Sequence, residues 1–121
     1  MKKLFFLISV LFFFTSTGML ANKTSVEIKA PAEIKKGTEV TIVINVFHYG
    51  NSATHHTDWV YLKINGKEVK RWQYDKENLP AAENFTLEFK VVATKNLTLE
   101  AEGHCNIHGS AGSKNATIKV K

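Results

Sequence analysis

Hydrophobic and polar residues alternate with a period of two over most of the chain that follows residue 21. The clearest example is the segment 40–46, in which Val40, Ile42, Ile44 and Val46 are separated by residues that are mostly polar or small. Successive side chains of a strand point to opposite faces, so this alternation predicts a strand with one buried face. No segment after residue 21 shows the period of an amphipathic helix.

Other short segments share this strand-like character, being rich in β-branched and aromatic residues and bounded by turn residues. They are residues 26–28, 59–64, 68–72, 85–91, 97–101 and 116–120. Asn65 and Gly66 separate two of them and predict a two-residue hairpin turn, because both turn positions require positive φ. About seven strands in a chain of this length predict an all-β fold, an immunoglobulin-like antiparallel β-sandwich. A small barrel is the alternative.

The first residues differ in composition from the rest of the chain. Lys2 and Lys3 precede an apolar run over residues 4–14, and residues 15–21 are mostly small or polar. This is the layout of a secretory signal peptide. The apolar run is shorter than the roughly 20 residues that span a bilayer, which disfavours an uncleaved anchor. We therefore expect a signal peptide at residues 1–21 and a single exported domain at residues 22–121, secreted or periplasmic and not bound to a membrane.

The formal net charge of the 121-residue chain is +5, and Lys2 and Lys3 contribute to it. The remaining lysines are spread along the chain and form no basic cluster, which argues against a nucleic-acid partner. A weak positive field of this kind can still attract a small anion.

All histidines and the single cysteine fall into two short regions. They are His48, His55 and His56 in one, and His104, Cys105 and His108 in the other. Both regions lie at strand ends or in loops, and loops at alternate strand ends of a sandwich meet at one pole. An exported protein with one cysteine has no internal disulfide, so the thiol serves another purpose. Metal ligation and inert burial are the two interpretations.

Cys105 and His108 are three positions apart, so a tight loop can direct both toward one ion. We expect Gly103 and Gly109, which flank the pair, to permit the sharp turn. Neighbouring residues in extended backbone point to opposite sides. His104 should therefore face away if Cys105 faces the site.

The same alternation allows only one of His55 and His56 to face the site. Several imidazoles with one thiolate suit redox iron or copper better than structural zinc. A copper site often adds a methionine, and both methionines precede residue 22, so iron is favoured and copper is the alternative. The N–H groups of Asn106 or Ile107 could donate to the cysteine sulfur and tune the metal.

The motifs resemble those of one known family. Residues 105–109 read Cys-Asn-Ile-His-Gly and resemble the Cys-Asn-(Leu/Ile)-His-Gly signature of superoxide reductases, namely neelaredoxin and the iron domain of desulfoferrodoxin. Residues 55–60 read His-His-Thr-Asp-Trp-Val and resemble the family's His-x-x-(acidic)-Trp-Ile segment. His48 resembles the preceding family histidine, and residues 31–37 resemble the family's Pro-x-x-(Val/Ile)-Lys-x-Gly stretch.

The resemblance implies an immunoglobulin-like sandwich with one ferrous iron that reduces superoxide to hydrogen peroxide. Carried over to this chain, it implies His48, His55 and His108 as equatorial ligands and Cys105 as the axial ligand. It also implies a role for Lys23 in attracting superoxide, and an external electron donor to restore the ferrous iron.

The chain departs from the family pattern at position 24. Aligned from residue 31, Thr24 stands where the family has its first histidine ligand, in a Glu-Lys-His context of which Lys23 remains. His56 or His104 could supply the missing nitrogen. The favoured interpretation is an exported superoxide reductase with an altered ligand set. The alternatives are a non-catalytic iron or copper module, for example for electron transfer, and a sandwich whose site has decayed and which serves protein contacts.

Overall fold

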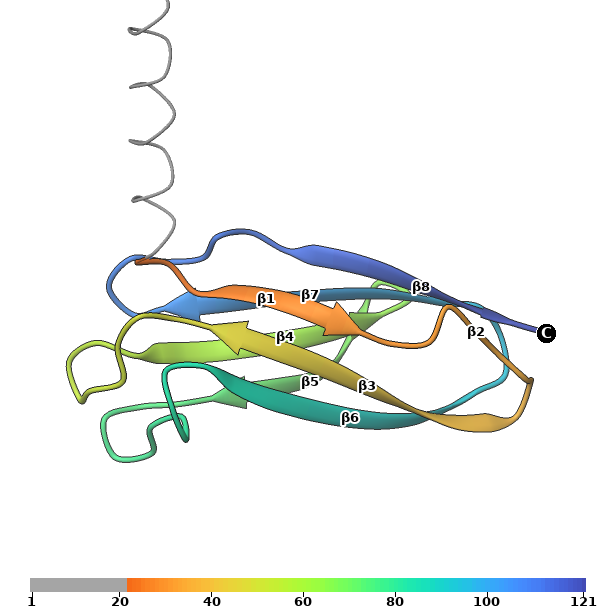
Figure 1. Ribbon diagram of the computed structural model, residues 1–121, viewed down its shortest axis with the longest axis horizontal. Helices are drawn as coiled ribbons and strands as arrows, with labels where there is room; N and C mark the ends of the chain where they lie inside the picture. Colours follow the sequence, from red (N-terminus) through yellow and green to blue (C-terminus); the bar gives the residue numbers. More distant parts are fainter. Residues whose placement is uncertain (1–21) are drawn as a thin grey trace, which may run out of the picture.

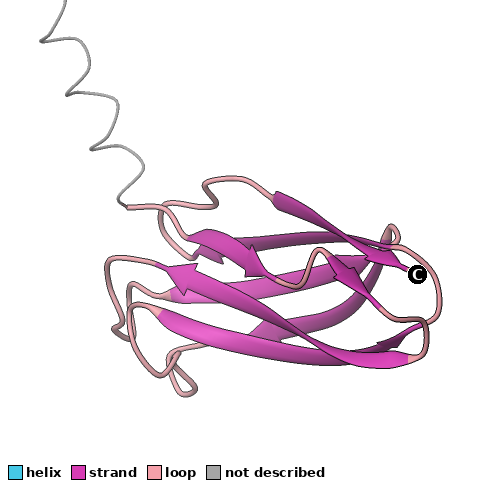
Figure 2. Ribbon diagram, turned by 45° about the vertical axis from the view of Figure 1, so that its right-hand side comes forward, coloured by secondary structure: helices cyan, strands magenta, loops and turns pink. Residues whose placement is uncertain are grey.

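The computed structural model describes residues 22–121 (Figures 1 and 2), and the signal peptide expected at residues 1–21 lies outside this part. All regular secondary structure here is β-strand, and no helix in these residues has the length and hydropathy needed to cross a bilayer. The strands are β1 (Ser25–Lys29), β2 (Glu33–Ile34), β3 (Thr38–Phe47), β4 (Thr57–Ile64), β5 (Lys67–Gln73), β6 (Phe85–Ala93), β7 (Leu97–Cys105) and β8 (Lys114–Val120).

The strands form two sheets that pack face to face, as Figure 2 shows from the side. One sheet has the order β1-β3-β6 and the other has the order β2-β8-β7-β4-β5. All strand pairs are antiparallel except β2 with β8. The predicted immunoglobulin-like sandwich is therefore confirmed, and the barrel alternative is wrong because no strand of one sheet is paired with a strand of the other.

The core between the sheets comes from the alternating residues of the central strands. Along β3 every second residue from Val40 to Val46 is buried, as the period of two predicts. Ile42 of β3 meets a layer from the facing sheet in which Leu62, Leu99 and Ile118 are fully buried. Burial of such side chains is the main source of stability in a domain of this size.

One turn and one short strand show what could and could not be predicted from the sequence. The hairpin between β4 and β5 turns at Asn65 and Gly66, whose φ angles are 51° and 80°, which confirms the predicted turn. The two-residue strand β2 has no counterpart among the predicted segments. It pairs in parallel with the end of β8, and two residues are too few to show a period.

Strand direction brings the histidine-containing segments together. Strands β3 and β7 both end, and β4 begins, at the pole on the left of Figure 1. Thr57 at the start of β4 is paired with Cys105 at the end of β7. The loop 48–56 and the loop 106–113 therefore lie beside each other at this pole.

Candidate metal site

The loops at this pole bring four of the candidate ligands into one cluster. The ligand atoms of His48, His55 and Cys105 all lie within 4.8 Å of one another. His108 completes the group, because its Nδ1 is 3.2 Å from Nε2 of His55 and 3.9 Å from Sγ of Cys105. His48 and Cys105 form a buried base, while His55 is half-buried and His108 is exposed. The cluster is thus open to solvent on the His108 side.

His48 is held from both its backbone and its ring. Its N–H donates to Oδ1 of Asn84 at 3.1 Å, and its Nδ1 lies 2.8 Å from the carbonyl oxygen of Gly50. Burial lowers the pKa of His48, and the imidazoles of His55 and His108 lower it further, although the bond to Gly50 opposes this. The ring is therefore neutral at pH 7, with the proton on Nδ1. Its Nε2 is buried and has no hydrogen-bond partner in the described chain.

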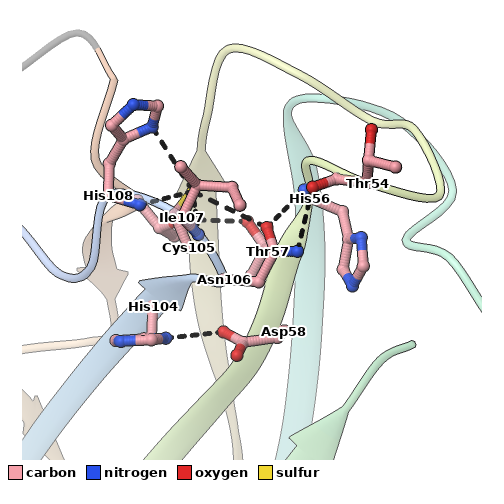
Figure 3. Close-up of polar contacts among 10 residues, drawn as sticks. Thr54, His56, Thr57, Asp58, His104, Cys105, Asn106, Ile107 and His108 are labelled. Atoms are coloured by element: carbon pink, nitrogen blue, oxygen red, sulfur yellow. Dashed lines mark hydrogen bonds and ion pairs between the residues drawn. The ribbon is translucent and has the colours of Figure 1, made fainter. Parts of the chain in front are cut away.

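Cys105 is fully buried, and its sulfur receives two backbone donors. The N–H groups of Ile107 and His108 each lie 3.4 Å from Sγ (Figure 3). Such donors disperse the charge of a cysteine sulfur that is bound to a metal. The expectation of a donor from Ile107 is confirmed. The Asn106 N–H is not a donor to sulfur, because it donates instead to the carbonyl of His56 at 3.1 Å.

The two glycines that flank this motif have different tasks. Cys105 and Gly109 exchange two backbone hydrogen bonds of 2.9 Å, and Gly109 has a φ of +81°, so it does close the tight loop as predicted. Gly103 lies within β7 and not in the turn. A Cβ at Gly103 would come within 2.7 Å of the Thr24 methyl group, so this glycine allows close packing between the sheets.

Asn106 joins the two loops of the site. Its Oδ1 accepts from the backbone N–H of His56 at 3.0 Å, and its Nδ2 donates to the carbonyl of Thr54 at 3.2 Å (Figure 3). These bonds fix the segment that presents His55 against the segment that presents Cys105. Sequence reasoning did not identify this role, nor that of Asn84, because both depend on contacts between distant parts of the chain.

His56 and His104 do not join the cluster, so the idea that either supplies a fourth nitrogen is wrong. The His56 ring is buried and its Nδ1 lies 2.9 Å from the carbonyl of Ser52. The His104 ring lies 2.7 Å from an Asp58 oxygen and stacks on Trp59 with ring centroids 4.9 Å apart. Both rings point away from Cys105 in Figure 3, as the alternation of strand residues predicted.

Thr24 lies beside the site without contributing to it. Its backbone bonds to Gly109 and Ala111, which hold it behind the Cys105 loop. Its side chain is fully buried, and its hydroxyl is 3.0 Å from the hydroxyl of Thr57. The Thr24 hydroxyl is thus already partnered in the interior. Its neighbour Lys23 is half-buried and takes part in none of the ion pairs found within residues 22–121.

These residues fit a metal ion. Imidazole nitrogens and a thiolate converge on one point, and the unpartnered Nε2 of His48 is a buried lone pair that a metal would satisfy. The other nitrogen of that ring is fixed by a backbone carbonyl, as is usual for histidine ligands. Several imidazoles and one thiolate suit a redox-active transition metal better than a structural zinc.

Solved structures with this fold include superoxide reductases. The superoxide reductase (neelaredoxin) from Ignicoccus hospitalis is 24% identical, with 82% of this chain and 83% of that chain covered and a TM-score of 0.67. The superoxide reductase (neelaredoxin) from Archaeoglobus fulgidus in the reduced form is 21% identical, with 78% and 89% covered and a TM-score of 0.56.

The fold also occurs in a domain of another class. The CARDB domain of a Pyrococcus furiosus protein is 17% identical, with 83% of this chain and 94% of that chain covered and a TM-score of 0.58. The fold alone therefore does not identify the protein. A search of curated proteins finds no match.

The sequence itself identifies the family. The desulfoferrodoxin family matches residues 18–112, a span that includes both loops of the metal cluster. The family resemblance noted from the sequence motifs is thereby confirmed, and none of the comparisons supports the copper alternative. This chain belongs to the desulfoferrodoxin family.

Proposed function

We propose that the protein is an exported superoxide reductase that holds one non-haem iron through His48, His55, His108 and Cys105. The observation that carries the proposal is the convergence of these four side chains, with the His48 Nε2 left unpartnered. Membership of the desulfoferrodoxin family and the likeness to neelaredoxin structures support iron as the metal and superoxide as the substrate.

The reaction adds one electron and two protons to superoxide and yields hydrogen peroxide. Bound iron supplies the electron, and an external donor returns it to the ferrous state. The sulfur of Cys105 is buried and accepts hydrogen bonds from the N–H groups of Ile107 and His108, which would disperse the charge of a metal-bound thiolate. The exposed His108 leaves the cluster accessible to a small anion. Lys23 and the net charge of +3 that remains without Lys2 and Lys3 (+5 minus 2) favour its approach.

Export is part of this proposal and rests on the sequence of residues 1–21. A secreted or periplasmic location would expose the protein to superoxide outside the cytoplasm. The chain has a single cysteine and hence no separate cysteine-ligated iron centre, so electrons come from another protein or small molecule.

One observation favours a second candidate, a non-catalytic iron-binding or electron-transfer module. Position 24 is a threonine, which has no imidazole, and its hydroxyl is bonded to Thr57, so this position gives the iron no ligand. A changed ligand set changes the potential and the open positions of a metal. Such a protein would bind iron and accept electrons without consuming superoxide.

A stoichiometric assay separates these candidates. The protein is produced without oxygen, its bound metal is measured, and the ferrous form is mixed with superoxide in the presence of a reductant. Reduction gives one peroxide per superoxide and no dioxygen, whereas dismutation gives half as much peroxide. Iron that is not oxidised by superoxide would support the electron-transfer module, and one equivalent of copper or zinc with no reaction would contradict both iron proposals.

A further inference from the structure

Gly50 lies between the two histidines of the first loop and contacts both rings. Its carbonyl oxygen is 2.8 Å from Nδ1 of His48. A carbonyl can only accept a hydrogen bond, so this contact requires the proton of the neutral ring to be on Nδ1. The lone pair is then on Nε2, which is the buried atom without a partner. Gly50 thus selects the tautomer of His48 that can ligate a metal through Nε2.

The missing side chain of Gly50 also makes room for His55. A Cβ at this position would lie 2.6 Å from Nδ1 of His55, 3.0 Å from its Cε1 and 3.2 Å from its Cγ. Real Cβ atoms essentially never make a contact of 2.6 Å, and the other two are unusually tight, so the ring would have to move. The ring of His55 packs edge-on against that of His48, with centroids 4.8 Å apart, and lies 3.2 Å from Nδ1 of His108. Displacing His55 therefore disturbs the whole cluster.

Three other glycines lack this property although their φ angles are also positive. Gly50 has a φ of +129°. Gly37, Gly66 and Gly112 have φ values of +85°, +80° and +110°, and a Cβ on any of them would meet nothing within 4 Å. An alanine at each would be strained by its φ alone. At Gly50 it would also collide with a candidate ligand.

We propose that Gly50 is a positioning residue of the metal site, which fixes the His48 tautomer through its carbonyl and leaves the space that the His55 ring occupies. The inference rests on the proposed function only in that the cluster binds a metal. It does not require that the metal reduces superoxide.

Gly50→Ala tests the inference, with Gly37→Ala as the matched control, because Gly37 has positive φ and lies between β2 and β3, outside the loops of the metal site. The first readout is the affinity for ferrous iron, measured by competition with a chelator. Loss of a residue that orients ligands lowers metal affinity by about 10- to 100-fold, and we expect this for Gly50→Ala. Gly37→Ala should lower the unfolding midpoint and leave affinity within about twofold of the wild type.

The second readout needs neither metal nor activity. Nitrogen NMR of the metal-free wild type should show the His48 ring protonated on Nδ1, and in Gly50→Ala the His55 ring signals should shift. The inference is overturned if wild-type His48 is protonated on Nε2, or if both glycine variants lose iron affinity to the same extent. Because the wild-type tautomer is measured directly, the test stands even if Gly50→Ala does not fold. A wild type that binds iron but leaves superoxide unchanged would contradict the proposed function and not this inference.

Discussion

The buried hydroxyl pair of Thr24 and Thr57 allows a quantitative test of what position 24 does. Both side chains are buried, and their hydroxyl oxygens are 3.0 Å apart. Thr24→Val removes one hydroxyl at nearly constant volume. It leaves the buried Thr57 hydroxyl without its hydrogen-bond partner in the structure. An unpartnered buried polar group costs about 1–3 kcal/mol, so we expect the free energy of unfolding to fall by that amount.

The double variant makes this test specific to the pair. Thr57→Val should cost a similar amount, whereas Thr24→Val with Thr57→Val should be nearly neutral, because no unpartnered hydroxyl remains. The expected coupling between the two positions is about 1 kcal/mol or more. Urea unfolding of the metal-free protein measures it through the midpoint at constant slope. Thr117→Val, on the exposed side of β8, should stay within about 0.5 kcal/mol of the wild type.

Metal binding completes the test of position 24. The Thr24 hydroxyl is bonded to Thr57, so Thr24→Val should bind iron as tightly as the wild type does. Two results would refute this reasoning. One is additivity of the two single changes, which would mean that the hydroxyls do not depend on each other. The other is loss of iron from Thr24→Val, which would make the Thr24 hydroxyl part of the metal site.

Three further predictions concern groups around the cluster. Burial lowers the pKa of His48 below its usual 6.5, so the unfolded chain binds a proton at this ring more tightly than the folded chain does. The contribution of His48 to the stability of the metal-free protein is therefore complete above about pH 6.5 and is lost as the pH falls below it. His48→Gln should reduce this dependence of the unfolding temperature on pH. Asn106→Ala loses the bonds to the loop 48–56 and should cost about 1–2 kcal/mol with faster amide exchange in that loop, whereas Asn106→Asp retains the acceptor and should cost less. His104→Ala removes the contacts with Asp58 and Trp59 and should lower stability but leave metal content nearly unchanged; an empty site would show that the facing of β7 is assigned wrongly.

The local pattern of hydrophobic, polar and turn residues was sufficient to predict much of the fold. The alternation from Val40 to Val46 identifies both the strand β3 and its buried face, and Asn65-Gly66 identifies the β4–β5 hairpin. The strand β2 could not be predicted, because its two residues are held by a parallel pairing with the distant end of β8. A pairing between distant segments leaves no periodic signal in either of them.

The candidate ligands could be named from the sequence, but their supports could not. Clustering of His48, His55, Cys105 and His108 around a short motif was visible, and the structure brings these residues together. The contributions of Asn84 and Gly50 depend on how the loops fold back on each other, and no local pattern indicates them. The interior partner of Thr24 was likewise invisible, since Thr57 is 33 positions away.

The most direct test of the account is X-ray absorption at the iron edge of the protein loaded with one equivalent of ferrous iron, compared with Cys105→Ser. The cluster geometry predicts one sulfur ligand together with imidazole nitrogens in the wild type, and loss of the sulfur in the variant. A wild-type spectrum without sulfur, or one that Cys105→Ser leaves unchanged, would contradict the proposal that Cys105 and the three histidines hold the metal.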